Sequence, residues 1–405
     1  MQLIGPFSEI LTMDNLPLKA ALSDDQLEII RDGGIVIDKG KILEIDKFEV
    51  LKNKYPSIET EFLSDSYVCL PGMIDVHTHI CWAGSRAKDY AMRLSGKTYL
   101  EIAENGGGIW DTVSKTRQAS LDELVTLTVE RANTLYKQGI TTIEVKSGYG
   151  LSVESELKIL EAIKLANSQT MAELIPTCLA AHILPKDFIG TEEEYLQYVT
   201  TKLLPEIKAK NLASRVDIFV EKTAFSVKAA KVYLTEARKL GFDIVMHGDQ
   251  FSSSCAALAN EVSALSIDHL EAANNTEISI LAQGNTIPVV LPGASLGLGD
   301  AFAPARKLLD AGTSLVIASD WNPGSAPMGN LLTSAALLSS AEKLSMAEVW
   351  AALTIRAAAA LKKTDRGVLK IGKNADFIAF KTHDYKEILY RQGQMKPDKI
   401  WSSKK

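Results

Sequence analysis

MIDVHTH, residues 73–79, is a short apolar run that ends in two histidines one residue apart. Residues i and i+2 of a strand point to the same face, so His77 and His79 share one face and Thr78 points to the other. Two imidazoles on one rigid strand can bind one metal ion. This stretch therefore predicts a β-strand that presents a pair of candidate metal ligands.

Seven further apolar runs follow this strand, and most of them precede a segment with a helical pattern. The helical segments have good start signals, such as the capping boxes at 120–123, 191–194 and 345–348. The predicted strands are 73–79, 141–147, 174–182, 215–222, 242–249, 265–271, 286–292 and 314–320. Eight strands that alternate with helices predict an α/β fold, a closed parallel (β/α)₈ barrel.

Both ends of the chain show short β patterns instead of β/α units. Residues 34–46 alternate apolar and polar residues around a turn at 38–40, which predicts a β-hairpin. Near the other end, residues 372–380 and 386–394 predict two more short strands. Because β-rich ends flank a β/α middle, we expect the ends to pair into one small β domain.

The composition indicates a globular protein with a sizeable core. The chain has 405 residues, 46% of them hydrophobic, and a formal net charge of −6. It has no long lysine and arginine cluster and no apolar run of membrane-spanning length, so we expect neither a nucleic acid nor a membrane as a partner. The four cysteines are far apart, and no secretory signal is visible at the start, which predicts reduced thiols and a cytoplasmic location.

Five of the six histidines lie at the ends of predicted barrel strands, where the active sites of such barrels form. His77, His79 and His247, together with the carboxylate of Asp320, make a ligand set that suits one zinc or iron ion better than calcium or magnesium. A metal ion with an open position lowers the pKa of bound water towards neutrality. A single His-x-His pair would more often be structural, but this larger pattern indicates a centre that activates water.

Several motifs together resemble the imidazolonepropionase family of the amidohydrolase superfamily. PGMIDVHTH, MHGDQ, IDHLE and ASDWNPG are similar to motifs of the superfamily. VKSGYGL, LAAHILP, ASDWNPGSAP and the long run at 79–109 narrow the resemblance to the family. The similarity covers nearly the whole chain.

The resemblance implies a TIM-like barrel of residues 69–363 and a small β-sandwich domain built from residues 1–68 and 364–405. It implies one zinc or iron ion per subunit and a homodimer. It also implies hydrolysis of 4-imidazolone-5-propanoate to N-formimidoyl-L-glutamate, a step of histidine catabolism. Composition and spacing alone do not predict this substrate.

The implied substrate is a flat cyclic amide with a carboxylate tail, so it needs a cation and several polar groups. Arg86 is the best cation, because its planar fork matches a carboxylate; a surface arginine paired with Asp89 is the alternative. Tyr149 could donate a hydrogen bond and cover the ring, or be a packed loop tyrosine. By resemblance His182 binds the substrate, although a satisfied structural histidine is the competing interpretation.

Two loops carry the other predicted binding residues. By resemblance Asn322 and Gly324 bind the glutamate part of the product and Ser325 binds the substrate, while a turn rich in proline and glycine would explain the same residues without function. Gln250 stands where some family members have glutamate. An amide cannot act as a carboxylate base, so Gln250 is assigned to hydrogen bonding with the substrate ring.

The strand ends also supply the predicted catalytic groups. Asp320 is a metal ligand that could take the proton from the water as general base. His269 is a candidate for polarising the carbonyl or positioning the water, and the base stays open between these two residues. Lys146, at the end of the second strand, is interpreted as structural or ion-paired.

Two other functions remain possible at this point. A mononuclear deaminase of a nucleobase or related heterocycle would use the same ligands and would release ammonia, but a neutral purine has no use for Arg86. A barrel that only binds a metal or ligand would not need a base such as Asp320 beside its metal.

Overall fold

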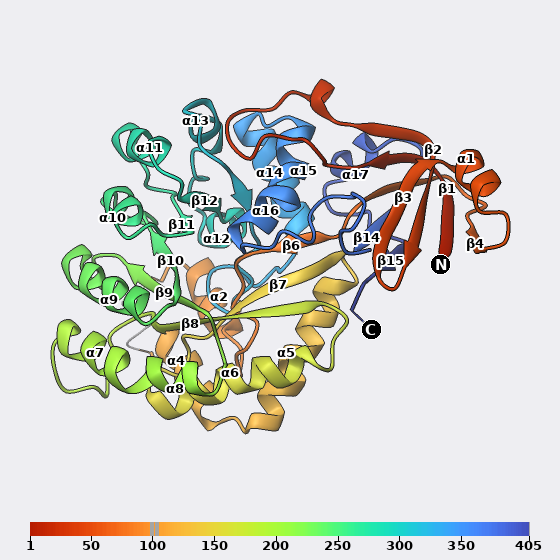
Figure 1. Cartoon of the computed structure of the whole chain (residues 1–405). Coiled ribbons are helices and arrows are strands. Elements are labelled where there is room, and N and C mark those ends of the chain that lie inside the picture. The colour runs from red at the N-terminus through yellow and green to blue at the C-terminus, as the bar shows by residue number, and fades with distance from the viewer. Residues whose placement is uncertain (98–100, 102–104, 405) are drawn as a thin grey trace.

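Figure 1 shows the chain as a computed structural model, which describes residues 1–97, 101 and 105–404. Part of the motif at 79–109 lies outside the described residues. The rest of the chain divides into a barrel with surrounding helices and a separate sheet beside it, where both termini lie (Figure 1). The predicted combination of a (β/α)₈ barrel and a small β domain is confirmed.

Eight parallel strands form the barrel sheet, hydrogen-bonded in sequence order from β6 to β13. They are β6 (Met73–Asp75), β7 (Ile140–Lys146), β8 (Glu173–Ala181), β9 (Arg215–Val220), β10 (Asp243–Gly248), β11 (Ser266–His269), β12 (Ile287–Val290) and β13 (Val316–Ile317). Each lies within its predicted run or overlaps it, so the sequence locates all eight. Most of these residues are buried on both faces, as expected for a parallel sheet covered by helices.

The barrel closes just beyond β6 and β13. The backbone N–H of Asp320 donates to the carbonyl of His77 at 3.0 Å, and the N–H of His79 donates to the carbonyl of Trp321 at 3.0 Å. A parallel bridge between Thr78 and Trp321 lies between these bonds. The closing hydrogen bonds therefore hold three of the predicted metal ligands side by side.

Helices follow most barrel strands. They are α2 (Ala87–Leu94), α4 (Ile109–Gln118), α5 (Leu121–Tyr136), α6 (Val153–Asn167), α7 (Glu192–Tyr198), the π-helix η2 (Val199–Leu203), α8 (Leu204–Ala209), α9 (Val227–Lys239), α10 (Ala256–Glu261), α11 (Asn275–Ala282), α12 (Pro292–Leu298), α13 (Ala305–Asp310), α14 (Leu331–Glu342), α15 (Met346–Leu353) and α16 (Ile355–Ala360). The side chains of Ser120, Thr191 and Ser345 cap α5, α7 and α15, and the predicted reciprocal capping box is present at Thr191 and Ser345. Among the described residues, no helix combines the length and apolar character that crossing a membrane requires.

The two ends of the chain share one seven-stranded sheet, in the order β15-β14-β5-β1-β2-β3, with β4 paired to β1. Its strands are β1 (Gln2–Leu11), β2 (Ile29–Asp38), β3 (Lys41–Lys47), β4 (Glu59–Phe62), β5 (Tyr67–Pro71), β14 (Phe377–Lys381) and β15 (Lys399–Trp401), with η1 (Asp24–Gln26) and α1 (Phe48–Lys54) between them. The predicted hairpin is β2–β3. Its turn residues Lys39 and Gly40 have φ of 47° and 74°, as a type I′ turn requires.

The sheet curves round its own apolar core. The Phe7 ring on β1 lies 6.5 Å from that of Phe377 and 6.0 Å from that of Trp401, although β5 and β14 separate β1 from β15 in the sheet. At the other edge, Lys41 of β3 bridges to Asn374, just before β14. The predicted boundaries at 68/69 and 363/364 stay predictions.

One local prediction is wrong. Residues 386–394 do not contain a strand but the short helix α17 (Lys386–Tyr390). The Asp384 side chain accepts a hydrogen bond from the N–H of Lys386, and Ile388 and Leu389 are buried on one side of the helix. β15 pairs with the free edge of β14, so residues 386–394 have no strand edge there with which to pair.

Candidate metal centre and active site

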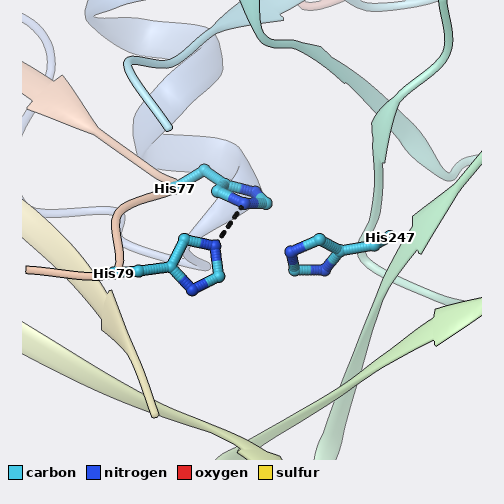
Figure 2. Close-up of side chains that lie close together, drawn as sticks. All are labelled: His77, His79 and His247. Atoms are coloured by element: carbon cyan, nitrogen blue, oxygen red, sulfur yellow. Dashed lines mark hydrogen bonds between the residues drawn. The ribbon is translucent and has the colours of Figure 1, made fainter. Parts of the chain in front are cut away.

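Three imidazoles meet at the carboxyl end of the barrel (Figure 2). His77 and His79 follow β6, and His247 lies on β10. Ligand atoms of the three side chains all lie within 4.8 Å of one another, and the Nε2 atoms of His77 and His79 are 3.2 Å apart. All three side chains are buried. The structure thus brings together the three histidines that the sequence predicts as metal ligands.

The carboxylate of Asp320 lies next to two of these imidazoles. Its Oδ1 atom lies 3.4 Å from His77 Nε2 and 3.3 Å from His79 Nε2. A tetrahedral ion with metal–nitrogen distances of about 2.0–2.1 Å separates its ligand atoms by about 3.3 Å. The Nε2 atom of His247 is buried and has no hydrogen-bond partner among the described residues. Spacing and donor types therefore fit a transition-metal ion.

Two buried carboxylates lie behind these imidazoles. Asp268 Oδ2 accepts a hydrogen bond of 2.6 Å from His77 Nδ1, and Asp217 Oδ1 lies 3.1 Å from His247 Nδ1. A histidine whose Nδ1–H donates to a carboxylate can present an unprotonated Nε2 to a metal, with its ring orientation fixed. Both carboxylates thus orient their imidazoles towards the same point.

Lys146, the last residue of β7, is buried among three carboxylates. Its Nζ atom lies 2.7 Å from Asp217, 2.9 Å from Glu144 and 3.4 Å from Asp268. Burial lowers the pKa of Lys146, but these carboxylates outweigh it and raise the pKa well above its usual value. The amine is protonated, and the interpretation of Lys146 as an ion-paired lysine is confirmed.

The ionisation of His77 and Asp320 follows from their mutual contacts. Burial and the Lys146 ammonium lower the pKa of His77, but hydrogen bonds to Asp268 and Asp320 outweigh them and raise it to about 9. Burial raises the pKa of Asp320, while His77 and His79 hold it well below its usual range. Without a metal, His77 is therefore protonated, and its positive charge lies beside the ionised Asp320.

The backbone is strained at two of the site residues. Asp320 has φ of 51° and His269 has φ of 91°, in the region that favours glycine. Such conformations cost on the order of 1–3 kcal/mol each and persist where the surrounding structure enforces them. Here they turn both side chains towards the end of the barrel.

A cavity of about 740 Å³ opens over these groups. Its wall includes the predicted site residues His79, Arg86, Tyr149, His182, His247, Gln250, His269, Asp320, Asn322, Gly324 and Ser325. His77 lies beneath it, fully buried. The structure therefore gathers all the predicted site residues at one end of the barrel.

Arg86 is the residue directly before α2, and its side chain reaches this cavity. Its Nε atom donates to Asp89, a buried carboxylate that also accepts the N–H of Gly108 at 2.8 Å. Within the described part of the chain, the Nη atoms of Arg86 make no hydrogen bond. Nη1 faces Gly324, where an added β-carbon would lie 3.4 Å from it. Arg86 is thus paired with Asp89, as the alternative interpretation has it, and its binding of a ligand carboxylate stays a prediction.

Tyr149 and His182 form one side of the cavity. The Tyr149 ring lies 5.7 Å from that of His182, which stacks on His79 at 5.5 Å. Burial and Asp320 raise the pKa of Tyr149, so its phenol stays protonated and can donate. Burial and His79 lower the pKa of His182 to about 3, so it is neutral. Its Nδ1 donates to the carbonyl of Gly148 at 3.1 Å, which leaves Nε2 as an acceptor.

Gln250 lies in a loop that is fixed on both sides. Glu221 accepts the backbone N–H groups of Phe251 and Ser252 at 2.9 and 3.0 Å. The carboxylate of Asp249 accepts two more backbone N–H groups further along the loop. The Gln250 side chain, which has no hydrogen-bond partner among the described residues, is left to face the cavity.

The side chain of Asn322 organises the loop after β13. Its Oδ1 accepts the N–H groups of Gly324 and Ser325 at 2.7 and 2.8 Å, and its Nδ2 donates to the carbonyl of Asp320 and to Ser325 Oγ. Ser325 Oγ in turn lies 3.5 Å from Asp320 Oδ2. These bonds occupy the Asn322 amide, so its predicted contact with a ligand stays a prediction.

His269 lies beside the ligand atoms without joining them. Its ring centroid is 5.4 Å from that of His247 and 5.8 Å from that of His77. Its Nδ1 is 3.4 Å from Glu271 Oε2. Because it borders the cavity, His269 can contact a substrate more readily than it can contact the metal.

Comparisons with known proteins agree with this geometry. Residues 68–403 match the model of the amidohydrolase family. The chain belongs to the amidohydrolase family. An imidazolonepropionase of Fusobacterium nucleatum subsp. nucleatum is 39% identical over 385 residues, which cover 94% of this chain and 93% of that protein.

Two more relatives extend the comparison. An imidazolonepropionase of Bacillus mycoides (strain KBAB4) is 37% identical over 403 residues, 98% of this chain and 94% of that protein. The solved adenosine deaminase of Xanthomonas campestris with bound zinc shares the fold, with a TM-score of 0.71 and 16% identity over 100% of this chain and 92% of that one. As an amidohydrolase, the chain is a metal-dependent hydrolase.

Sequence reasoning missed the carboxylates that support this amidohydrolase site. Asp217 and Asp268 were not singled out, although each stands inside an apolar strand, in VDIFV and SIDHL. A charged residue in such a run is seldom buried unless it is paired, and that was the available signal. Glu221, which holds the Gln250 loop, follows directly after β9 and gave no comparable signal.

The raised pKa of His77 predicts that metal uptake by this amidohydrolase releases a proton. Below pH about 9 the proton on His77 competes with the metal for the same nitrogen, so apparent affinity should rise about tenfold per pH unit between neutrality and that value. Chelator competition with the metal-free protein at several pH values measures this. The same slope should hold in His383→Ala, because His383 is exposed and outside the barrel. An affinity that does not change with pH would contradict the account.

Proposed function

We propose that this amidohydrolase is an imidazolonepropionase. It hydrolyses 4-imidazolone-5-propanoate to N-formimidoyl-L-glutamate in histidine catabolism. The observation that carries the proposal is the Arg86 guanidinium, whose Nη atoms make no hydrogen bond to the described residues. It lies at the wall of a cavity whose floor is a buried group of three histidines and one aspartate. Two relatives of 37% and 39% identity over nearly the whole chain carry this name. The anionic substrate and its cyclic amide match these two features.

The proposed ligands of the metal ion are His77, His79, His247 and Asp320. Zinc or iron is proposed, one ion per subunit, because three imidazoles and one carboxylate suit these ions. The zinc of the solved adenosine deaminase with the same fold supports zinc. Such an ion, when bound, supplies a Lewis acid that lowers the pKa of water and polarises a carbonyl.

Asp320 is proposed as the general base. Its Oδ1 faces the histidines, while the one hydrogen-bond partner of its Oδ2 among the described residues is the hydroxyl of Ser325 at 3.5 Å. Oδ2 takes the proton from the water that attacks the ring carbonyl. The same proton then passes to the ring nitrogen as its bond to the carbonyl carbon breaks. The carbonyl carbon becomes the new carboxylate, so water is consumed and no ammonia is released.

The ring is held from three sides. The protonated phenol of Tyr149 donates, and Nε2 of neutral His182 accepts an N–H. The amide of Gln250 can both donate and accept, which suits a ring with an N–H and an imine nitrogen. His269 is placed to donate to the carbonyl oxygen, where negative charge develops as the water attacks.

Arg86 is proposed to bind the propanoate tail. Its Nε is already fixed by Asp89, so the two Nη groups are presented without further loss of side-chain freedom. Nη1 lies close to Gly324, where an added β-carbon would be at van der Waals distance from it. Asn322 and Gly324 are proposed to bind the glutamate part of the product, and Ser325 is proposed to bind the substrate.

Three wider features complete the proposal. We propose that the enzyme is cytoplasmic and that it acts as a homodimer. We also propose residues 69–363 as the catalytic barrel and residues 1–68 with 364–405 as the accessory β domain. A small-molecule substrate requires neither a nucleic acid nor a membrane as partner.

Turnover of freshly made 4-imidazolone-5-propanoate by the metal-loaded protein tests the function directly. Loss of the ultraviolet absorbance of the substrate is expected without free ammonia. Asp320→Asn should fold and lose on the order of 10²–10⁴ in kcat, because an amide cannot accept the proton. Asp300→Asn, at the exposed rim of the same cavity, is the control. Ammonia as a product would favour a deaminase, and near-normal turnover by Asp320→Asn would remove Asp320 as base.

Replacement of Arg86 tests recognition of the tail. Arg86→Met should raise KM about 10–100-fold with a smaller effect on kcat, since it removes a charge-assisted pair. A ring analogue without the propanoate should react equally poorly with both proteins. Lys186→Met, an exposed lysine on the cavity rim, should change KM little. An unchanged KM in Arg86→Met would exclude Arg86 from the site.

A further inference from the structure

Lys146 is a fully buried charged residue that the proposed reaction does not use. Its side chain is 0% exposed, and a lysine is seldom fully buried unless it is paired. It lies beneath the cavity and does not line it, so it cannot contact a substrate there. Three carboxylate oxygens surround its ammonium at 2.7, 2.9 and 3.4 Å. A charged side chain with three carboxylate partners is not needed to fill the barrel interior, so Lys146 has another role.

Two of the three carboxylates are those that orient the metal-facing imidazoles. Asp217 Oδ2 lies 2.7 Å from Lys146 Nζ and 3.0 Å from His247 Nδ1. Asp268 Oδ2 lies 3.4 Å from the same Nζ and 2.6 Å from His77 Nδ1. One ammonium therefore connects the supports of two histidines that are 170 residues apart in the chain and belong to β10 and the extension of β6.

The third carboxylate anchors the ammonium itself. Glu144 lies two residues before Lys146 on β7, and its Oε2 is 2.9 Å from Nζ. Its Oε1 is held by Arg215 at 3.1 Å and by the hydroxyl of Thr177 at 2.5 Å. Arg215 and Thr177 thus fix Glu144 from the side of the barrel away from the histidines. Glu144 in turn fixes the position of the Lys146 ammonium.

Loss of the ammonium would leave this cluster unbalanced. Among the lysines and arginines of the described residues, Arg215 alone would remain in direct contact with the three carboxylates, and it contacts only Glu144. Asp217 and Asp268 would then be buried with histidines as their partners. Buried carboxylates without a compensating charge repel one another and move towards other donors.

We propose that Lys146 is a positioning residue of the metal centre: its ammonium holds Asp217 and Asp268 so that His77 and His247 present their Nε2 atoms to one ion. The inference rests on the proposed ligands and deepens them. According to this inference, the buried lysine affects metal affinity and the geometry of the ligands. If Lys146 only stabilised the barrel, its replacement would leave metal affinity and ligand geometry unchanged in a variant that still folds.

Metal binding by Lys146→Met tests this assignment. Methionine has similar length and no charge, and the metal-free protein is titrated with Zn²⁺ and Co²⁺ against a chelator. Replacing an outer partner of metal ligands typically weakens binding 10–100-fold, and this is the loss expected here. The visible absorption of the Co²⁺-loaded variant should also differ from wild type, because ligand geometry changes.

Lys158→Met is the matched control. The partly buried Lys158 ammonium donates to the carbonyls of Arg117 and Ala119, so its removal also takes a cation and its hydrogen bonds from the barrel wall, but away from the histidines. It should keep wild-type metal affinity and Co²⁺ absorption. Lys146→Arg, which keeps the cation, should bind metal more tightly than Lys146→Met.

The possible failures are distinguishable. If Lys146→Met does not fold, Lys146→Gln, which keeps an N–H donor without the charge, takes its place in the titration. Folded neutral variants with wild-type affinity and absorption overturn the role of Lys146 alone. Wild-type protein that binds no metal at these histidines, or that does not turn over 4-imidazolone-5-propanoate, overturns the proposed function instead.

Discussion

The hydrogen bonds between residues 77–79 and 320–321 join the first and last strands of the barrel, and the site depends on them. The N–H of Asp320 meets the carbonyl of His77, and the N–H of His79 meets the carbonyl of Trp321, both at 3.0 Å. Because side chains on this ladder face the cavity at fixed spacing, closure of the fold places two imidazoles and a carboxylate together. The positive φ of Asp320 is part of the same turn.

Charge balance is the second constraint. The site collects four buried carboxylates, those of Asp217, Asp268, Glu144 and Asp320, against one lysine and one arginine. A proton on His77 relieves part of this excess in the metal-free protein, and a divalent ion relieves more of it. The need for a cation between the histidines therefore follows from the carboxylates that orient them, as well as from the ligand nitrogens themselves.

Much of the fold could be predicted because the barrel strands are apolar runs with histidines and an aspartate at their ends. The capping residues Ser120, Thr191 and Ser345 predicted the helix starts, because a helix cap depends only on residues that are close in the sequence. The segment 386–394 was misjudged because its apolar residues fit either a strand or one turn of helix, and only β15 beside β14 decides between them. Contacts across the barrel, such as Lys146 to Asp217, join residues 71 apart and have no signature in local spacing.

X-ray diffraction from metal-loaded crystals, with anomalous data at the absorption edge of the ion, tests the central claim most directly. The account predicts one peak per chain, bonded to Nε2 of His77, His79 and His247 and to Oδ1 of Asp320. A peak bonded to other residues, or none in protein that turns over substrate at full rate, would contradict it.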